Sequence, residues 1–321
     1  MKDSVKGNIA LLTTALIWGS GFVAQKLGMN YIGPFAFNGM RQIIASIILI
    51  PLAVHTIMTT GYFSKEKYGD ETVGIRKKNL FKASIWCGVF LALGTNLQQI
   101  GLVTVSAGKV GFISAIYIVM VPIIGLFFGD NVGKKLWMCV ALALVGFMLL
   151  SLNGGLGGIT SGDLLTLAGA FFFAAQIVCI NMHVTQDNSL ILSTTQMIVS
   201  GIISLTLMFI FEDHSVATLM SGALPIMYSA LFPTAIGFTL QVVGQQYVNP
   251  TTASLILSLE AVFGAIFGIF FLHETMTPRE FAGSVLIFSS ILAAQMPDKK
   301  GRAEIREIQK MNEKKESQNR E

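Results

Sequence analysis

The sequence predicts an all-α integral membrane protein with ten transmembrane helices, arranged as two five-helix inverted repeats. Hydrophobic residues make up 53% of the chain and charged residues only 12%, about half the charged fraction of an ordinary soluble domain. The apolar residues occur in runs of about twenty, long enough to cross a hydrocarbon core as helix. The second half of the chain also repeats the residue pattern of the first. Because the runs are continuous rather than alternating, we expect helices and not a β-barrel.

Hydropathy places the ten helices, and the positions of the prolines support their ends. Most prolines lie at or near an expected end, where a missing amide hydrogen bond costs least. Pro122 and Pro233 instead lie inside the fourth and eighth helices, where we expect kinks of the kind found in moving or cavity-lining segments. The expected helices cover residues 8–28, 34–54, 80–103, 107–128, 134–153, 163–184, 191–211, 223–246, 251–272 and 279–296.

Basic residues are unevenly distributed over the expected loops. With a cytoplasmic N-terminus, all of the 22 lysines and arginines lie in cytoplasmic segments except Lys26, Arg41, Lys109 and Arg279. The positive-inside rule therefore predicts a multi-pass protein of the cytoplasmic membrane, with both termini in the cytoplasm. Because this placement accounts for the net charge of +4, we expect the lipid bilayer, and no nucleic acid, as a partner.

The internal repeat follows two constant shifts in residue number. A shift of 155 places the first two helices on the sixth and seventh, with Gly7 on Gly162. A shift of 144 places helices three to five on helices eight to ten, with Thr95 on Thr239. The sequence is thus divided into a first repeat, a glycine-rich connecting loop, a second repeat and a charged cytoplasmic tail, at residues 1–153, 154–162, 163–296 and 297–321.

The odd number of spans in each repeat has a topological consequence. The second repeat must enter the membrane with the opposite orientation to the first. In secondary transporters, two inverted halves move about a central site and open it alternately to each side of the membrane. The alternative is that the duplication serves only to build a stable helix bundle.

Five stretches of the chain are typical of one known group of membrane proteins when taken in order. They are residues 17–22 (IWGSGF), Arg41, residues 98–122 with the motif SAGK, residues 257–260 (LSLE) and residues 272–274 (LHE). In these stretches the sequence resembles the drug/metabolite transporter superfamily, specifically its ten-helix EamA-type permeases, over residues 8–296. The resemblance implies export or exchange of small polar metabolites, often amino acids or drugs, through a central cavity formed by helices one to four and six to nine.

Glu260 is the acidic residue that lies deepest in an expected helix, near the middle of the ninth. A charged group at that depth costs on the order of 2.5 to 3.5 kcal/mol on insertion scales, so it needs a partner or a function. Burial favours the protonated carboxyl, which makes Glu260 a candidate for proton coupling or for binding a substrate amine. The alternative is a hydrogen-bonded glutamate that joins two helices.

Arg41 lies about two turns inside the second helix, with Asn38 and Gln42 within one turn of it. We expect this polar patch to face the bundle, where the guanidinium either binds a substrate carboxylate or holds helix-end carbonyls in place. Snorkelling to the membrane interface is the alternative for Arg41. It is the expected behaviour of Lys26 and Lys109, which lie nearer the helix ends.

Amide and aromatic side chains complete the candidate cavity. Amides three or four residues apart face one way on helix three and on helix eight, and aromatic rings near mid-depth would supply apolar walls. The alternative for each amide is a hydrogen bond between helices, worth under about 1 kcal/mol. With Arg41 and Glu260, the candidate cavity residues are Trp18, Asn96, Gln99, Tyr117, Gln176, Gln241 and Gln245.

Motifs of catalysis and of cofactor binding do not occur in this sequence. The four histidines are scattered without metal-ligand spacing, and no HExxH, GxSxG or P-loop is found. Cys87, Cys139 and Cys179 lie in apolar runs, where we expect them to serve as small packing residues. Gly264 and Gly268 have the small-xxx-small spacing that allows close helix packing. We therefore expect neither an enzyme nor a bound cofactor or metal.

Taken together, these features favour a secondary active transporter, an exporter or exchanger of small polar metabolites such as amino acids or drugs, that works by alternating access. Its expected partners are a small-molecule substrate, the lipid bilayer and a proton, and it would be either a monomer or a homodimer. The alternative within this class is an uncoupled facilitator. The alternative outside it is a non-transporting membrane subunit.

Overall fold

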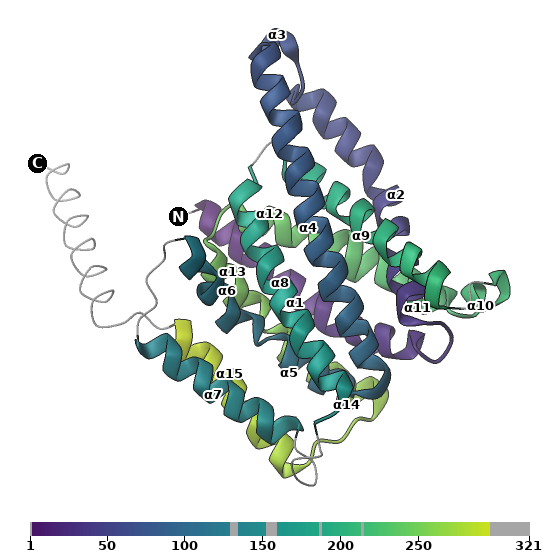
Figure 1. The fold of residues 1–321 in the computed structure, drawn as a ribbon, viewed down its shortest axis with the longest axis vertical. Coiled ribbons are helices and arrows are strands. Elements are labelled where there is room, and N and C mark those ends of the chain that lie inside the picture. The colour runs from purple at the N-terminus through teal and green to yellow at the C-terminus, as the bar shows by residue number, and fades with distance from the viewer. Residues whose placement is uncertain (1, 129–133, 152–158, 186–187, 213–214, 296–321) are drawn as a thin grey trace, which may run out of the picture.

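A helical bundle forms the body of the molecule (Figure 1). The computed structural model describes residues 2–128, 134–151, 159–185, 188–212 and 215–295, and these ranges contain no strand. Within them, eight helical segments are long and apolar enough to cross a membrane. The prediction of an all-α membrane protein is therefore confirmed. Residues 154–158 of the predicted connecting loop and the whole predicted tail, residues 297–321, lie outside the described residues.

Each of the ten predicted spans corresponds to one helix or to consecutive helices. The first half contains α1 (Lys2–Gly28), α2 (Pro34–Thr60), α3 (Lys65–Tyr68), α4 (Asp70–Thr104), α5 (Ala107–Ser114), α6 (Tyr117–Gly125), the short η1 (Leu126–Phe128) and α7 (Lys134–Ser151). The second half contains α8 (Ser161–His183), α9 (Ser189–Phe211), α10 (Val216–Ser221), α11 (Ala223–Ser229), η3 (Ala230–Phe238), α12 (Thr239–Gln245), α13 (Pro250–Leu257), α14 (Glu260–Leu272) and α15 (Pro278–Gln295).

Local sequence signals account for several of the helix ends. Pro34 occupies the first turn of α2, where its missing amide hydrogen is not needed, and Gly61 ends that helix in the left-handed conformation with a φ of 61°. Thr160 and Asp163 form a reciprocal capping box at the start of α8. The charged segment after α2 differs from the expected loop, because α3 and the first turns of α4 make it helical.

Two spans are broken near their middle, at equivalent places in the two repeats. The fourth span breaks between α5 and α6, and the ninth breaks between α13 and α14. At each break a tight bond to the third residue back replaces the regular helical bond, from Ile116 N to Ile113 O and from Leu259 N to Ile256 O. Transporters use such discontinuous helices to expose backbone and side-chain groups at mid-membrane. We predicted a kink at Pro122, but the fourth span breaks before that residue.

The eighth span is distorted as the sequence predicts. Its central segment η3 is a π-helix that contains Pro233. A proline has no amide hydrogen and displaces the carbonyl four residues earlier, so a wider turn relieves the clash. The carbonyl oxygen of Pro233 accepts a hydrogen bond of 3.0 Å from Trp18 Nε1 on α1. The distortion therefore connects the eighth span to the first.

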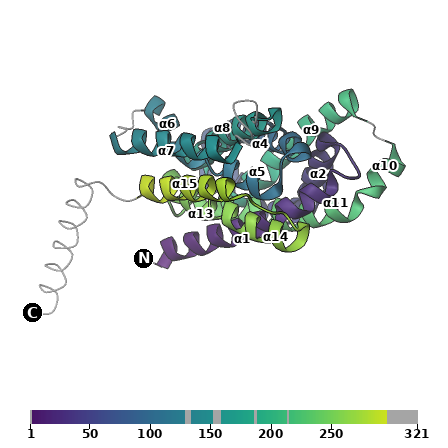
Figure 2. The same cartoon turned by 90° about the horizontal axis from the view of Figure 1, so that it is seen from below.

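The two repeats exchange helices with one another. Helix α1 of the first half packs mainly against α14, α12 and η3 of the second half, and its equivalent α8 packs mainly against α4, α6 and α5 of the first half. Two other equivalents pair with each other, α2 with α9 and α7 with α15. Figure 1 and Figure 2 both show α7 and α15 side by side. This exchange is the packing expected of two halves related by a pseudo-twofold axis.

Contacts at the helix ends show that α1 and α8 run in opposite directions. Lys26, near the end of α1, hydrogen-bonds to Leu102 at the end of α4. Helix α5 begins directly after α4, and its Lys109 forms an ion pair with Asp163 at the start of α8. The end of α1 and the start of α8 thus lie at the same end of the bundle. The predicted inverted repeat is therefore present in the fold.

Small residues allow the close helix contacts. A methyl group added at Gly264 would approach the Phe22 ring to 2.9 Å, which confirms the predicted packing role of that residue in α14. All three cysteines are buried, as expected of small packing residues. Cys87 on α4 and Cys179 on α8 are buried free thiols whose sulfur atoms lie 3.0 Å apart, across the contact between the two halves.

Candidate functional site

A polar cavity lies where the helices of the two halves meet. Its cavity volume is about 40 Å³, room for water molecules but less than a bound metabolite needs, so the site is nearly closed in this conformation. Six of the nine predicted residues line it, namely Trp18, Arg41, Tyr117, Gln176, Gln241 and Glu260. The other lining residues are Phe22, Gln25, Thr95, Gln98, Phe173, Ile177, Pro233 and Phe238.

Arg41 forms part of the cavity wall and is only 3% exposed. Its Nε donates a hydrogen bond of 2.9 Å to Asn38 Oδ1, and the Asn38 amide is held in turn by donation to Thr95 O at 2.9 Å. The guanidinium also lies over the Phe37 ring, 5.9 Å from its centroid. Among the described residues, Arg41 has no carboxylate partner within 4.0 Å. The side chain is thus oriented by neutral groups, and its terminal nitrogens can take an anion from the cavity.

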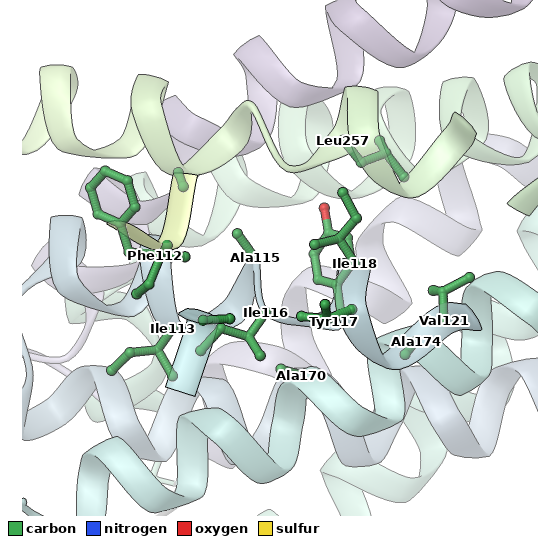
Figure 3. Close-up of a cluster of buried hydrophobic side chains, with 14 of the residues drawn as sticks. Phe112, Ile113, Ala115, Ile116, Tyr117, Ile118, Val121, Ala170, Ala174 and Leu257 are labelled. Carbon is green, nitrogen blue, oxygen red and sulfur yellow. The ribbon is translucent and has the colours of Figure 1, made fainter. Parts of the chain in front are cut away.

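Glu260 and Tyr117 face the cavity from the two helix breaks. Glu260 is the first residue of α14 and Tyr117 is the first residue of α6. The two side chains lie beside each other, although the Tyr117 hydroxyl has no hydrogen-bond partner of good geometry. Figure 3 shows the Tyr117 ring next to the break, between Ala174 of α8 and Leu257 of α13.

Three glutamines form an ordered row at the cavity wall. Gln241 Nε2 donates to Gln176 Oε1 at 3.1 Å, and Gln176 Nε2 donates to Gln196 Oε1 at 3.1 Å. Gln241 and Gln176 line the cavity, and Gln196 lies behind them on α9. Because each amide fixes the next, the wall presents its hydrogen-bonding groups in a defined orientation.

The other three predicted residues lie beside the cavity and not in its lining. Asn96 Nδ2 donates to Ser204 Oγ at 2.8 Å, which ties α4 to α9. Gln99 Nε2 donates to Gln25 O at 3.3 Å, and Gln245 Nε2 donates to Ile177 O at 3.0 Å. In this structure these amides join helices, which is the alternative that the sequence left open for each of them.

Sequence reasoning missed several lining residues, and for one of them a signal was present. Phe173 is the repeat equivalent of Trp18 at the shift of 155 residues, so the repeat alone could have identified it. Gln98, which donates to Ser114 Oγ at 2.8 Å, was noticed only as part of a family-like stretch. Gln25 and Phe238 have no comparable signal, because an isolated glutamine or phenylalanine in a helix does not show which way it faces.

Lys26 and Lys109 depart from the snorkelling that we expected. Lys109 Nζ lies 2.9 Å from Asp163 Oδ1, and this carboxylate is completely buried. Lys26 Nζ donates to backbone carbonyls at the end of α4. Both ammonium groups therefore neutralise charge or partial charge within the protein instead of reaching into solvent.

Known proteins share this sequence pattern along almost the whole chain. A model of the EamA-like transporter family matches residues 5–152 and 160–294. A protein of Archaeoglobus fulgidus named as an uncharacterized transporter is 31% identical over 90% of this chain and 85% of its own. A protein of Escherichia coli named as the uncharacterized inner membrane transporter YedA is 24% identical over 88% of this chain and 89% of its own.

One further relative is named for an activity, and a solved structure shares the fold. A probable amino-acid metabolite efflux pump of Salmonella typhimurium is 25% identical over 90% of this chain and 94% of its own. A crystal structure with 14% identity superposes with a TM-score of 0.63, covering 90% of this chain and 96% of that one, so the two share a fold. With a family model that covers both repeats, the chain belongs to the EamA-like transporter family.

Proposed function

We propose that this transporter exports or exchanges small metabolites that carry both a carboxylate and an amine. The proposal rests on one observation, the presence of Arg41 and Glu260 in the same cavity. No ion pair joins them among the described residues. An arginine and a glutamate that do not neutralise each other can bind the two charges of a zwitterion.

Each charge of such a substrate has a distinct partner. The Arg41 guanidinium matches a carboxylate in a fork geometry, since Asn38 already fixes its Nε side. Glu260 accepts the ammonium group, and the Tyr117 hydroxyl and the Gln176 amide provide neutral hydrogen bonds nearby. The rings of Trp18 and Phe238, whose centroids are 4.8 Å apart, form an apolar wall for the side chain.

Proton coupling follows from competition at Glu260. A protonated carboxyl has lost the negative charge that holds an ammonium group, so a proton and the substrate amine exclude each other. Entry of a proton from one side would release the substrate, and loss of the proton to the other side would prepare the site again. This is proton exchange for substrate, with alternating access supplied by the two inverted halves.

The orientation and the relatives support the same proposal. The distribution of basic residues favours cytoplasmic termini. Export follows from the proposed coupling, because a proton gradient directed into the cell drives substrate outward when the two are exchanged. The Salmonella typhimurium relative is named a probable amino-acid metabolite efflux pump. A zwitterionic amino acid or a close derivative is the simplest molecule with both required charges.

Counter-flow in proteoliposomes tests the proposed substrate class. The purified protein is reconstituted, the vesicles are loaded with one unlabelled metabolite, and entry of the same labelled compound is followed. We expect transient accumulation with zwitterionic amino acids, and little with their N-acetyl or carboxamide derivatives, each of which lacks one charge. Equal exchange of these derivatives, or no exchange above protein-free vesicles, would contradict the proposal.

A separate measurement distinguishes proton exchange from uncoupled diffusion. Both mechanisms give counter-flow, but only proton exchange moves protons when substrate is added to one side. A pH-sensitive dye enclosed in the vesicles should therefore report a substrate-dependent pH change. An uncoupled facilitator would give exchange without that change.

A further inference from the structure

Lys26 of α1 is bound to the end of α4. Both helices belong to the first half of the chain, but α1 packs mainly with the eighth and ninth spans, whereas α4 packs mainly with α8. Lys26 Nζ donates to Leu102 O at 2.7 Å, to Val105 O at 2.9 Å and, more weakly, to Val103 O at 3.3 Å. These carbonyls lie at the end of α4, where the last carbonyls have no partner within the helix and carry partial negative charge. The ammonium therefore acts as a C-terminal cap supplied from a different helix.

Asn181 of α8 makes the corresponding contact elsewhere in the bundle. Its Nδ2 donates to Gln245 O at 3.2 Å and to Val248 O at 3.0 Å. These carbonyls lie at and just beyond the end of α12. Asn181 thus caps the end of the eighth span as Lys26 caps the end of the third.

The repeat makes these two contacts equivalent. Asn181 follows Lys26 by the shift of 155 that relates the first and sixth spans. The shift of 144 carries Leu102 and Val105 to within one residue of Gln245 and Val248. Because α1 and α8 run in opposite directions, the two contacts lie at opposite ends of the bundle.

Each contact crosses the boundary between the two packing groups around the cavity. Helix α1 packs mainly with the eighth and ninth spans, whereas α4 packs mainly with α8. Lys26 therefore joins the α1 group to the α8 group at one end, and Asn181 joins them at the other. The groups cannot separate at either end unless the contact at that end breaks.

We propose that Lys26 and Asn181 are paired latches that close opposite ends of the cavity, and that their unequal strength determines which end opens more readily. This inference rests on the proposed alternating access. The Asn181 end is also held by Gln245, whose Nε2 donates to Asn181 Oδ1 and to Ile177 O, the latter at 3.0 Å. All of these bonds are neutral, and a charge-assisted hydrogen bond is roughly twice as strong as a neutral one, so the Asn181 end opens more readily. The Lys26 end is held further by Glu274, whose carboxylate accepts from Ala107 N at 2.6 Å and Gly108 N at 3.0 Å.

Distances between spin labels measure the opening of each end directly and require no substrate. In full-length protein with Cys87, Cys139 and Cys179 replaced by serine, one label pair occupies Leu27 and Val103, and a second occupies the repeat equivalents Met182 and Tyr247. We expect the longer, open distance to be more populated at the Met182–Tyr247 end. The two pairs are matched by the repeat, so their distributions can be compared directly.

Exchange of the two latch residues should reverse this bias. We expect Lys26→Asn to raise the ratio of open to closed molecules at the Lys26 end by about fivefold, the effect of about 1 kcal/mol. The double change Lys26→Asn with Asn181→Lys should make the Lys26 end the more open one. Lys26→Arg keeps the charge and should keep that end closed, which guards against reading a folding defect as opening.

Lys67→Asn is the matched control, because Lys67 Nζ also donates to a helix-end carbonyl, Thr60 O at 3.0 Å, but within one hairpin of the first half. It should leave both distributions unchanged. Unaltered distances in Lys26→Asn, or equal opening of both ends, would overturn the latch proposal. Failure of counter-flow with shifted distances would instead reject the proposed substrate class and leave the latches standing.

Discussion

Replacement of Glu260 by glutamine is expected to abolish uptake driven by a proton gradient, lowering the initial rate in proteoliposomes by at least about tenfold. Glutamine keeps the size and much of the hydrogen bonding of the side chain but cannot bind or release a proton at physiological pH. Glu260 is buried, lines the cavity and begins α14 at the break in the ninth span.

The matched control is Glu66→Gln, because Glu66 is an exposed glutamate of α3. That variant should transport at the original rate. Gradient-driven uptake that persists unchanged in Glu260→Gln would remove Glu260 from the coupling mechanism. A loss of both gradient-driven uptake and protein folding, measured by thermal unfolding in detergent, would indicate a structural role instead.

Replacement of Arg41 by glutamine is expected to raise the KM for a zwitterionic substrate about tenfold to a hundredfold. The estimate follows from the loss of a hydrogen-bonded charge contact worth about 1.5 to 3 kcal/mol. The KM of Arg41→Lys should lie between those of the original protein and Arg41→Gln, because lysine keeps the charge but loses the planar fork that matches a carboxylate. The measurement is the concentration dependence of exchange in reconstituted vesicles.

A substrate analogue separates binding from a structural role of Arg41. The carboxamide derivative of the substrate has no carboxylate, so its weak exchange should be the same in the original protein and in Arg41→Gln. Arg279→Gln replaces an exposed arginine at the start of α15. This variant should exchange both the acid and its carboxamide at the original rates. An equal loss for the acid and the amide in Arg41→Gln would show that Arg41 supports the helices and not the ligand.

The sequence predicted the architecture well because lipid imposes simple requirements on it. Long apolar runs must be helices in a membrane, and the constant shifts in residue number predicted the inversion that α1 and α8 display. The burial of Arg41 and Glu260 was predicted for the same reason, since a charge at that depth needs a protein environment. Their shared cavity depends on packing between distant helices, which local pattern does not encode.

The helix breaks and the latch contacts are the features that sequence reasoning could not provide. The residues at the break between α5 and α6 are apolar and carry no proline or glycine signal at Ala115 and Ile116. Snorkelling was expected of Lys26 because the sequence places it near a helix end. The sequence does not show that the last carbonyls of α4 lie within its reach. Asn181 attracted no interest as a single amide. It became informative only when its contacts could be compared with those of its repeat equivalent.

Alternating access itself is tested most directly by labelling one cavity residue from each face of the membrane. Thr95 lines the cavity and is buried, and Thr95→Cys in the cysteine-free protein can be modified by a membrane-impermeant thiol reagent. We expect reaction from both faces, with Lys26→Asn raising the rate from one face and lowering it from the other. Rates that rise together would indicate a channel, and the absence of reaction from one face under every condition would contradict alternating access.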